Sequence, residues 1–214
     1  TVPGSATAPA DFTAVAVTPL AFAAGQATRQ VTVEVSGEVV FEGNETFTVV
    51  LSNPSAGWSI GDGQGLGTIQ NDDVQPSLAI ADLTQFEGTG GSTAFTFQLT
   101  LSAPSGFPVS GSFSTTDGSA VAPGDYAASV LVPFIFPPGT TSTGITVQVV
   151  ADAAAEPVED FTASLALVAG AALADGIAQA AILDDDGAPQ LAISDASGLE
   201  GTGLSTSLVF TVSR

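Results

Sequence analysis

The feature that most constrains the fold of this chain is an internal repeat, because most of its motifs occur twice, 113 or 114 positions apart. The run PSLAIAD at 76–82 recurs as PQLAISD at 189–195. The motif Glu-x-x-Glu-x-Phe begins at Glu42 and again at Glu156. One offset maintained over a whole chain does not arise by chance, so the protein is built from copies of one unit.

The repeated unit of about 113 residues has the size of a β-sandwich domain and is too long for a solenoid repeat. Aligned on the repeat, the chain holds the later part of one unit at 1–74 (the first unit), a complete unit at 75–187 (the second unit) and the opening part of another at 188–214 (the third segment). The sequence begins at Thr1 without a signal peptide, so we expect a processed piece or an excerpt of a longer array.

Alternation of apolar and polar residues with period two predicts strands in every unit. In residues 93–101, Phe95, Phe97, Leu99 and Leu101 alternate with Thr, Gln or Ala, as in a strand with one buried face. Comparable apolar faces recur at 31–35, 47–51, 145–149, 161–165, 178–183 and 208–212.

Turns rich in Gly and Pro separate these strands. The Ala-rich run 168–174 is interpreted as a loop, because the matching run 55–60 of the first unit contains Ser, Gly and Trp and is not helical in pattern. About seven short antiparallel strands in about 110 residues predict an all-β fold of sandwich type.

The charge of the chain is strongly one-sided, with 22 acidic residues, two Arg, no Lys and no His, for a net charge of −20. Such a chain has no basic surface for nucleic acid or for an anionic membrane. No apolar run approaches about 18 residues, so no membrane span is expected. Without Cys or His, thiol chemistry and typical Zn²⁺ sites are excluded as well. The expected partners are cations.

The acids of the second unit are clustered rather than scattered, and four loops carry the clusters: Glu87, Asp125, Asp152 to Glu159, and Asp184 to Asp186. Consecutive antiparallel strands place alternate loops at opposite ends of a sandwich, so these four loops could meet at one end. Six to eight carboxylates without a Lys or Arg repel one another, but they suit Ca²⁺, which takes about 6–8 oxygen ligands.

Several motifs resemble those of Calx-beta domains. They are Glu87-Gly88, DGSAVAPGDY at 117–126, Asp152-x3-Glu156-x2-Glu159, AILDDD at 181–186 and, in the first unit, FAAGQATRQVTV at 22–33 and EGNETF at 42–47. The resemblance covers the whole chain. It implies an immunoglobulin-like sandwich of seven strands with Ca²⁺ held by acidic loops at one end.

Carried over by position, the resemblance implies two sets of calcium ligands. In the second unit they are Glu87, Asp125, Asp152, Glu156, Asp184, Asp185 and Asp186. In the first unit they are Asp11, Glu38, Glu42, Glu45, Asp72 and Asp73, with Asn71 in place of an acid and with Glu200 of the third segment corresponding to the front acid that this unit lacks. Because Asp152 is flanked by alanines instead of further acids, one or two ions per unit are expected.

Some of these acids have simpler interpretations. Asp11 and Asp125 could cap a turn, and for Glu45 and Glu159 a solvated role is weighed equally with a ligand role. The triplet 184–186 could be a soluble linker. The recurrence of each cluster at one spacing favours metal binding.

The leading functional hypothesis is a calcium-binding structural repeat of a secreted or cell-surface bacterial protein, such as an adhesin stalk, fibre or matrix component. Ca²⁺ would stiffen loops and the joints between units. The alternatives are a calcium-sensing module of a larger protein and a metal-free passive spacer. An enzyme is disfavoured, because only carboxylate chemistry remains and the carboxylates are crowded instead of forming one separated pair.

The third segment corresponds to strands that the first unit does not contain. Copies could therefore complete one another end to end by strand addition. The alternative is that the ends are arbitrary cuts, which the lack of any counterpart to residues 102–114 favours.

Overall fold

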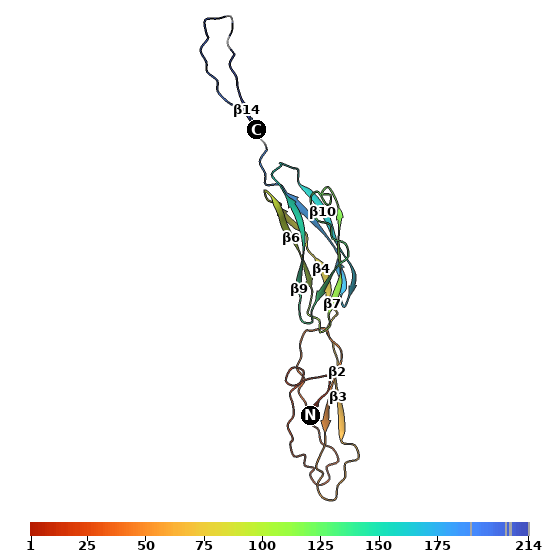
Figure 1. Ribbon diagram of the computed structural model, residues 1–214. Coiled ribbons are helices and arrows are strands. Elements are labelled where there is room, and N and C mark those ends of the chain that lie inside the picture. Colours follow the sequence, from red (N-terminus) through yellow and green to blue (C-terminus); the bar gives the residue numbers. More distant parts are fainter. Residues whose placement is uncertain (189, 204, 206, 214) are drawn as a thin grey trace.

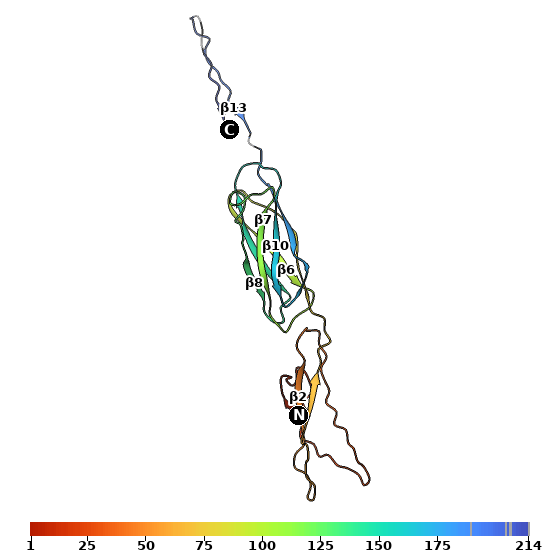
Figure 2. The ribbon, with the colours of Figure 1, turned by 90° about the vertical axis from the view of Figure 1, so that its right-hand side faces the viewer.

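The computed structural model describes residues 1–188, 190–203, 205 and 207–213. Pro189 of the repeated motif and Arg214, one of the two basic residues, lie outside the described part. The described part contains strands and no helix, which confirms the all-β expectation. The first unit, the second unit and the third segment follow one another in a row (Figures 1 and 2). Accordingly, no described helix is long and apolar enough to cross a membrane.

The second unit is a sandwich of two sheets (Figure 1). One sheet has the order β5 (Leu83–Phe86), β12 (Ile177–Leu183), β10 (Glu159–Ala169), β7 (Val109–Asp117) and β8 (Val132–Phe136). The other has the order β11 (Ala172–Asp175), β4 (Ser77–Ile80), β6 (Gly91–Leu101) and β9 (Ser142–Ala151).

Side chains from both sheets fill the space between them. Phe97 of β6 lies 5.5 Å from the ring of Phe113 in β7 and 6.0 Å from the ring of Phe161 in β10, and all three are fully buried. Tyr126 stacks on Phe161 with ring centroids 4.2 Å apart. The alternating residues predicted to face inward, such as Phe95 and Phe97, therefore form one core.

The expectation of a loop at 168–174 was wrong except at residues 170–171, because Val168 and Ala169 end β10, and Ala172–Asp175 forms β11 and pairs parallel with β4. Alanines carry no period-two signal, so only the neighbouring strand makes this segment extended. Gly170 turns the chain between β10 and β11 at a φ of +87°, and a Cβ there would lie 2.7 Å from the carbonyl oxygen of Pro108.

The first unit is less regular. Its sheet has the order β1 (Val2–Pro3), β2 (Glu45–Val50) and β3 (Gln64–Ile69). Phe12 and Phe47 stack at 4.6 Å in a small core. The strand predicted at 31–35 is reduced to one bridge between Phe12 and Val35. Its counterpart in the second unit takes its hydrogen bonds from β6, and residues 1–74 contain no equivalent of β6.

The third segment forms a long hairpin, closed by the antiparallel pair β13 (Ala192–Ile193) and β14 (Val212–Ser213). Its apolar residues Leu191, Leu208 and Phe210 are exposed. The hairpin extends from the end of the second unit that is opposite to the first unit (Figure 1).

Candidate metal centre

Strand register brings the acidic loops of the second unit to one end of the sandwich. The last residue of β12, Leu183, pairs with the last residue of β5, Phe86, and the start of β10 pairs with the end of β12. The end of β9 pairs with the start of β6. Because paired strand ends lie side by side, the loop after β5, the loop between β9 and β10 and the loop after β12 meet at this end.

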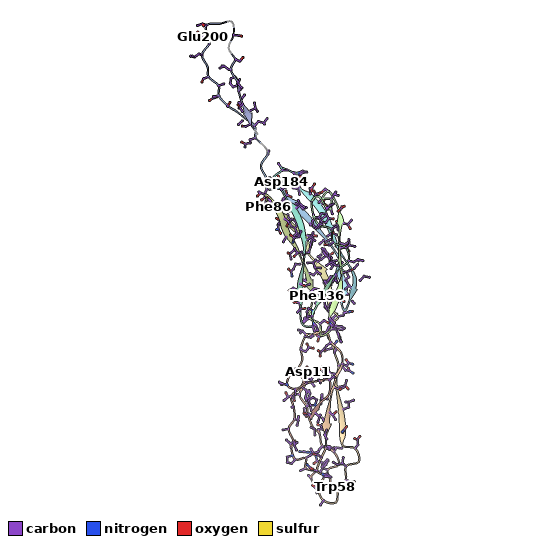
Figure 3. All side chains as sticks on the ribbon, in the orientation of Figure 1. Asp11, Trp58, Phe86, Phe136, Asp184 and Glu200 are labelled. Atoms are coloured by element: carbon purple, nitrogen blue, oxygen red, sulfur yellow. The ribbon has the colours of Figure 1, made fainter. Side chains whose placement is uncertain are left out.

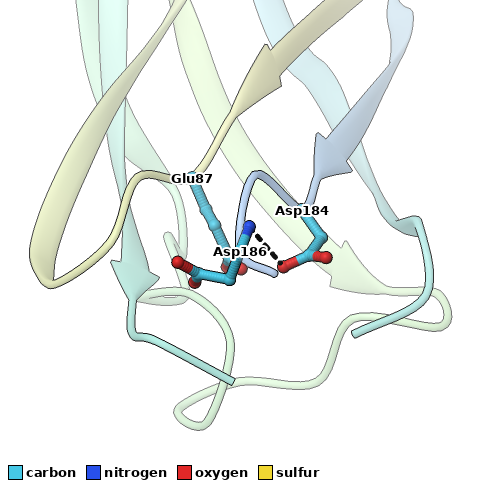
Figure 4. A group of neighbouring side chains, drawn as sticks. All are labelled: Glu87, Asp184 and Asp186. Atoms are coloured by element: carbon cyan, nitrogen blue, oxygen red, sulfur yellow. Dashed lines mark hydrogen bonds between the residues drawn. The ribbon is translucent and has the colours of Figure 1, made fainter. Parts of the chain in front are cut away.

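Three carboxylates form the centre of this group, as Figure 4 shows. Glu87 follows β5, and Asp184 and Asp186 follow β12. One oxygen from each lies within 4.8 Å of the others. The backbone N–H of Glu87 donates to the carbonyl oxygen of Leu183 at 3.0 Å, and the N–H of Asp186 donates to Oδ1 of Asp184 at 3.3 Å. These bonds fix the two loops against each other.

The burial of this group distinguishes it from a solvated acidic patch. Glu87 is only 6% exposed, and its Oε1 and the Oδ2 of Asp186 are buried without a hydrogen-bond partner. A buried carboxylate without a donor is costly, so the pair calls for a cation or a proton. An all-oxygen set of carboxylates fits Ca²⁺ and offers no nitrogen or sulfur for Zn²⁺.

The protonation of Glu87 reflects the same crowding. The pKa of Glu87 is raised from 4.5 to about 7, mainly by burial and in smaller part by the charges of Glu156, Asp152, Asp184 and Asp186. Burial and the neighbouring aspartates also raise the pKa of Asp186. Glu156 and Asp152 therefore lie close enough to contribute to one negative field.

Two further predicted ligands hold the loops in shape. Oδ1 of Asp185 accepts a hydrogen bond from the N–H of Gly88 at 3.0 Å and joins the β12 loop to the β5 loop. Oδ2 of Asp125 accepts from the N–H of Val121 at 2.6 Å, which is the turn-capping role weighed above. Burial raises the pKa of Glu159, and the charge of Asp125 raises it further, so Asp125 lies near the acidic end.

Two acids outside the predicted set stabilise the neighbouring loop. Asp117 accepts hydrogen bonds from the Tyr126 hydroxyl at 2.6 Å and from the N–H of Ala122 at 3.1 Å. Asp160 accepts from the hydroxyl of Ser119 at 2.6 Å. These bonds lower the pKa of both acids. The repeat does not mark them, because the first unit has Pro3 and Thr46 at the matching positions.

The first unit gathers its own acids around a cavity of about 120 Å³. Its lining includes Asp11, Glu38, Glu42, Glu45, Asn71, Asp72 and Asp73. Oδ1 of Asn71 accepts from the N–H of Glu42 at 3.1 Å, and Oε2 of Glu45 is buried without a hydrogen-bond partner. Burial is the main cause that raises the pKa of Glu42 and of Glu45, and neighbouring acids add to it.

Two predicted ligands of the first unit, Asp11 and Glu200, have surroundings unlike those of the other acids of that set. Asp11 caps a turn, since its Oδ2 accepts from the N–H of Thr7 at 2.6 Å, and this bond lowers its pKa. Glu200 lies in the third segment, and the second unit lies between it and Asp11 (Figure 3). The structure does not bring Glu200 to either acid cluster of its own chain.

The raised pKa of Glu87 predicts how the metal-free protein responds to pH. A carboxyl with a folded pKa of about 7 and an unfolded value near 4.5 holds its proton more tightly in the folded state. Its stabilising contribution is complete below about pH 4.5 and is lost as the pH rises through 7. In chelator we expect the free energy of unfolding to fall by at most about 3 kcal/mol between pH 5 and pH 8.

Urea unfolding followed by near-UV circular dichroism measures this loss, because the only tyrosine, Tyr126, is buried in the second unit. Glu87→Gln should flatten the dependence above pH 5. The acids with lowered pKa, such as Asp117, act only at lower pH. Equal stability of the unsubstituted protein at pH 5 and pH 8 would contradict the prediction.

Comparison with solved structures finds chains similar to this one. The apo form of the Calx CBD1 domain is 24% identical, with a TM-score of 0.46, over 53% of this chain and 100% of that chain. CBD12 from CALX1.2 is 26% identical, with a TM-score of 0.47, over 59% of this chain and 53% of that chain. The calcium binding domain CBD12 of CALX1.1 is 26% identical, with a TM-score of 0.46, over 59% and 54%. The chain thus spans about half the length of the two CBD12 chains.

No curated protein matches the chain. The family model of the Calx-beta domain matches residues 1–73 and again residues 71–186, which together make up most of the sequence. This result confirms the resemblance drawn from the acidic motifs, and the chain belongs to the Calx-beta domain family.

Proposed function

We propose that this chain is a calcium-binding structural part of a tandem array in a secreted or cell-surface bacterial protein, such as an adhesin stalk, a fibre or a matrix component. Three features support the proposal: membership of the Calx-beta family, a net charge of −20, and buried carboxylates that lack hydrogen-bond partners. A similar solved structure, that of CBD12 of CALX1.1, is described as a calcium binding domain. The ligand sets for the two units are those given above.

The observation that carries the structural role is the contact between the first two units. The N–H of Phe41 donates to the carbonyl oxygen of Pro104 at 3.1 Å, and the N–H of Gly106 donates to the carbonyl oxygen of Phe41 at 2.9 Å. The ring of Phe41 also meets that of Phe107 at 6.1 Å, edge to face. Phe41 is thus held by the second unit through both its backbone and its ring.

The same loop takes part in the acid cluster of the first unit. Glu38 and Glu42, on either side of Phe41, both line the acidic cavity. A Cβ at Gly106 would lie 3.0 Å from the Cβ of Glu42, so this acid lies directly against the second unit. Ca²⁺ in the cavity would neutralise carboxylates that otherwise repel one another and would hold the loop in the conformation that the joint requires.

This arrangement predicts that calcium and Phe41 both control the stiffness of the joint. In small-angle scattering, excess chelator should broaden the distance distribution relative to millimolar Ca²⁺. Phe41→Ala should broaden it even in Ca²⁺, because the ring contact with Phe107 is lost. Calcium binding by the second unit should stay within about twofold of the unsubstituted protein.

The matched control is Phe22→Ala. The repeat maps Phe22 to Phe136, which lies at the end of the second unit opposite to Asp184 (Figure 3). Phe22 is 54% exposed, so its removal should leave the scattering profile unchanged. Superimposable scattering profiles with Ca²⁺ and with chelator would contradict the stiffening of the joint by Ca²⁺. The chain would then be a passive spacer.

Calcium sensing within a larger protein is the second candidate function. The loop 38–42 also favours calcium sensing, because it lines the acid cluster of the first unit and contacts the second unit. Isothermal titration calorimetry separates the two functions. A dissociation constant of about 10⁻⁷–10⁻⁵ M is the range of sensors, whereas about 10⁻⁴–10⁻³ M is that of extracellular modules.

A further inference from the structure

The edge strands of the second unit differ in how far they are protected. Residues 75–187 are all described, and their two sheets end in the edge strands β5, β8, β9 and β11. β5 and β11 have four residues each, and β8 contains Pro133, which has no backbone N–H. Short edges and prolines hinder the addition of a strand from another chain. β9 has ten residues without a proline, a charged residue or a bulge against β6, so it carries none of these protections.

A loop covers the part of β9 that is next to the acidic end. Tyr126 of this covering loop bridges to Val149. On either side of the bridge, the N–H of Val150 and the carbonyl oxygen of Gln148 form hydrogen bonds to the backbone of the loop at 2.8 Å each. Val150 and Gln148 therefore direct their backbone groups away from β6. Along an antiparallel strand, every second residue shares this direction.

The stretch of β9 from residue 142 to residue 146 is not covered. The alternation turns the N–H and C=O groups of Ser142, Gly144 and Thr146 away from β6, and all three residues are exposed. Among the residues that the structure describes, no strand or loop forms a hydrogen bond with these groups. The hydroxyl of Thr146 lies 2.9 Å from that of Thr96 in β6, which orders this stretch. β9 thus presents an ordered row of unpaired backbone donors and acceptors.

The first unit carries charges at the matching positions. Arg29 corresponds to Thr143 and Glu34 to Gln148. The segment TRQVTVE of the first unit therefore has a charge near either end, whereas STGITVQ of the second unit has none. Charges on an edge strand oppose its pairing with another chain. The unprotected edge is thus specific to the second unit and is not a general property of the repeat.

We propose that β9 of the second unit pairs antiparallel with β9 of a second copy across a two-fold axis. The covering loop of each copy confines the pairing to the uncovered stretch. The symmetric register that fits this stretch places Gly144 opposite Gly144 and Ser142 opposite Thr146, as hydrogen-bonded pairs. Thr143 then lies opposite Ile145. The two four-stranded sheets become one continuous sheet.

The distribution of charge favours a second copy as the occupant. At a net charge of −20, two copies repel each other wherever their acids face one another. Residues 88–116 and 126–151, which include β6, β8 and β9, hold no acid, so two copies meet there with the least repulsion. A cationic partner would be drawn to the acid clusters instead. A second copy also brings an unpaired edge of the same length.

The shape of the molecule leaves room for this contact. Figure 1 shows β9 at the side of the second unit, while the first unit and the third segment continue the row beyond the two ends of the sandwich. Antiparallel pairing of β9 places two rows side by side in opposite directions. This lateral contact goes beyond the proposed function, because it joins neighbouring arrays and uses no calcium ligand.

Sedimentation velocity over about 5–500 μM protein tests the pairing, in about 0.15 M salt so that repulsion between copies reaches only about 8 Å. In millimolar Ca²⁺ we expect the weight-average mass to rise with concentration from one copy toward two and to stop there. A monomer at about 500 μM would overturn the proposal and leave the edge to an extended segment of another protein. Growth beyond two copies would overturn the closed two-fold pairing.

Proline at residue 146 tests the role of the backbone donor. Thr146→Pro removes an N–H that points away from β6, so the ladder with β6 keeps its hydrogen bonds while the dimer loses one bond on each side of the axis. We expect dimerisation to weaken at least about tenfold. Thr146→Val is the matched control, because it removes the hydroxyl contact with Thr96 but keeps the N–H, and it should dimerise as the unsubstituted protein does. Equal dimerisation of the proline and valine variants would contradict the assignment of this edge.

Two measurements keep this result independent of misfolding. Near-UV circular dichroism of the buried Tyr126 should be the same in Thr146→Pro and in the unsubstituted protein. Ser142→Pro, at the first residue of β9, is a second variant that removes an outward N–H, and it should weaken dimerisation as well. If both proline variants keep the Tyr126 signal and dimerise fully, the proposal is wrong.

The register can be trapped directly, because the chain has no native cysteine. A protein with Ser142→Cys and Thr146→Cys should form disulfide-linked dimers, since these exposed residues lie opposite each other in the proposed register. Thr143→Cys with Thr146→Cys should cross-link far more slowly, because the two residues face opposite sides of the sheet. Faster cross-linking of this control pair would overturn the register. Loss of dimerisation while Ca²⁺ still raises the melting temperature refutes only this inference, whereas dimerisation without any effect of Ca²⁺ refutes only the proposed function.

Discussion

Millimolar Ca²⁺ is expected to raise the melting temperature of the second unit by about 10 °C or more relative to excess chelator. A ligand that binds only the folded state at a hundredfold excess over its dissociation constant stabilises it by about 2.7 kcal/mol. One kcal/mol shifts the melting temperature of a domain of this size by about 4 °C or more. Near-UV circular dichroism reports mainly on the second unit, because the single tyrosine, Tyr126, is buried there, whereas the single tryptophan, Trp58, is 79% exposed in the first unit.

The controls for this result address the metal and the site separately. Mg²⁺ should give a much smaller rise, because it demands near-octahedral geometry and keeps its waters. Glu87→Gln should remove most of the rise in Ca²⁺, yet it should not destabilise the metal-free protein, since a neutral amide replaces a repelled carboxylate. An equal melting temperature in Ca²⁺ and in chelator would contradict calcium binding by the acids of the second unit.

Replacement of Phe161 by alanine is expected to have the largest effect on stability. Its ring is fully buried, stacks on Tyr126 at 4.2 Å and meets Phe97 at 6.0 Å, so the substitution leaves a cavity between the two sheets. Truncation of a buried Phe to Ala typically costs about 3–5 kcal/mol. Urea unfolding in chelator measures the loss without the contribution of the metal.

Phe86→Ala is the matched control for that experiment. Phe86 is 55% exposed at the end of β5, so its removal should cost less than about 1 kcal/mol. If Phe161→Ala cost no more than Phe86→Ala, the ring of Phe161 would not be at the centre of the core. The two variants remove the same atoms and differ in burial.

The strands were predictable where a partner strand is present. The alternation of Phe95, Phe97 and Leu99 marks one buried face of β6, and the structure buries all three. The equally regular alternation at 31–35 yields only an isolated bridge, because a strand also needs a neighbour for its hydrogen bonds. Conversely, β11 has no pattern of its own and exists through its pairing with β4.

The acid clusters were predictable as groups, but not the part that each acid plays. The repeat and the charge balance mark 184–186 and Glu87 as one type of site. They do not show that Glu87 is buried, nor that one carboxylate oxygen of Asp185 accepts a hydrogen bond from the N–H of Gly88. Glu45, which was weighed equally as ligand and as solvated residue, lines the cavity with a buried oxygen that has no hydrogen-bond partner.

The sequence by itself determined the repeat, the period of the strands, the sign of the charge and the chemical type of the ligand atoms, because these depend on single residues and on their spacing. The tertiary structure decided which carboxylates meet. Gly88 and Asp185 are 97 positions apart, and only the parallel pairing of β5 with β12 brings their loops together. The tertiary structure also decided which oxygens are buried, because burial arises from the packing of both sheets around them.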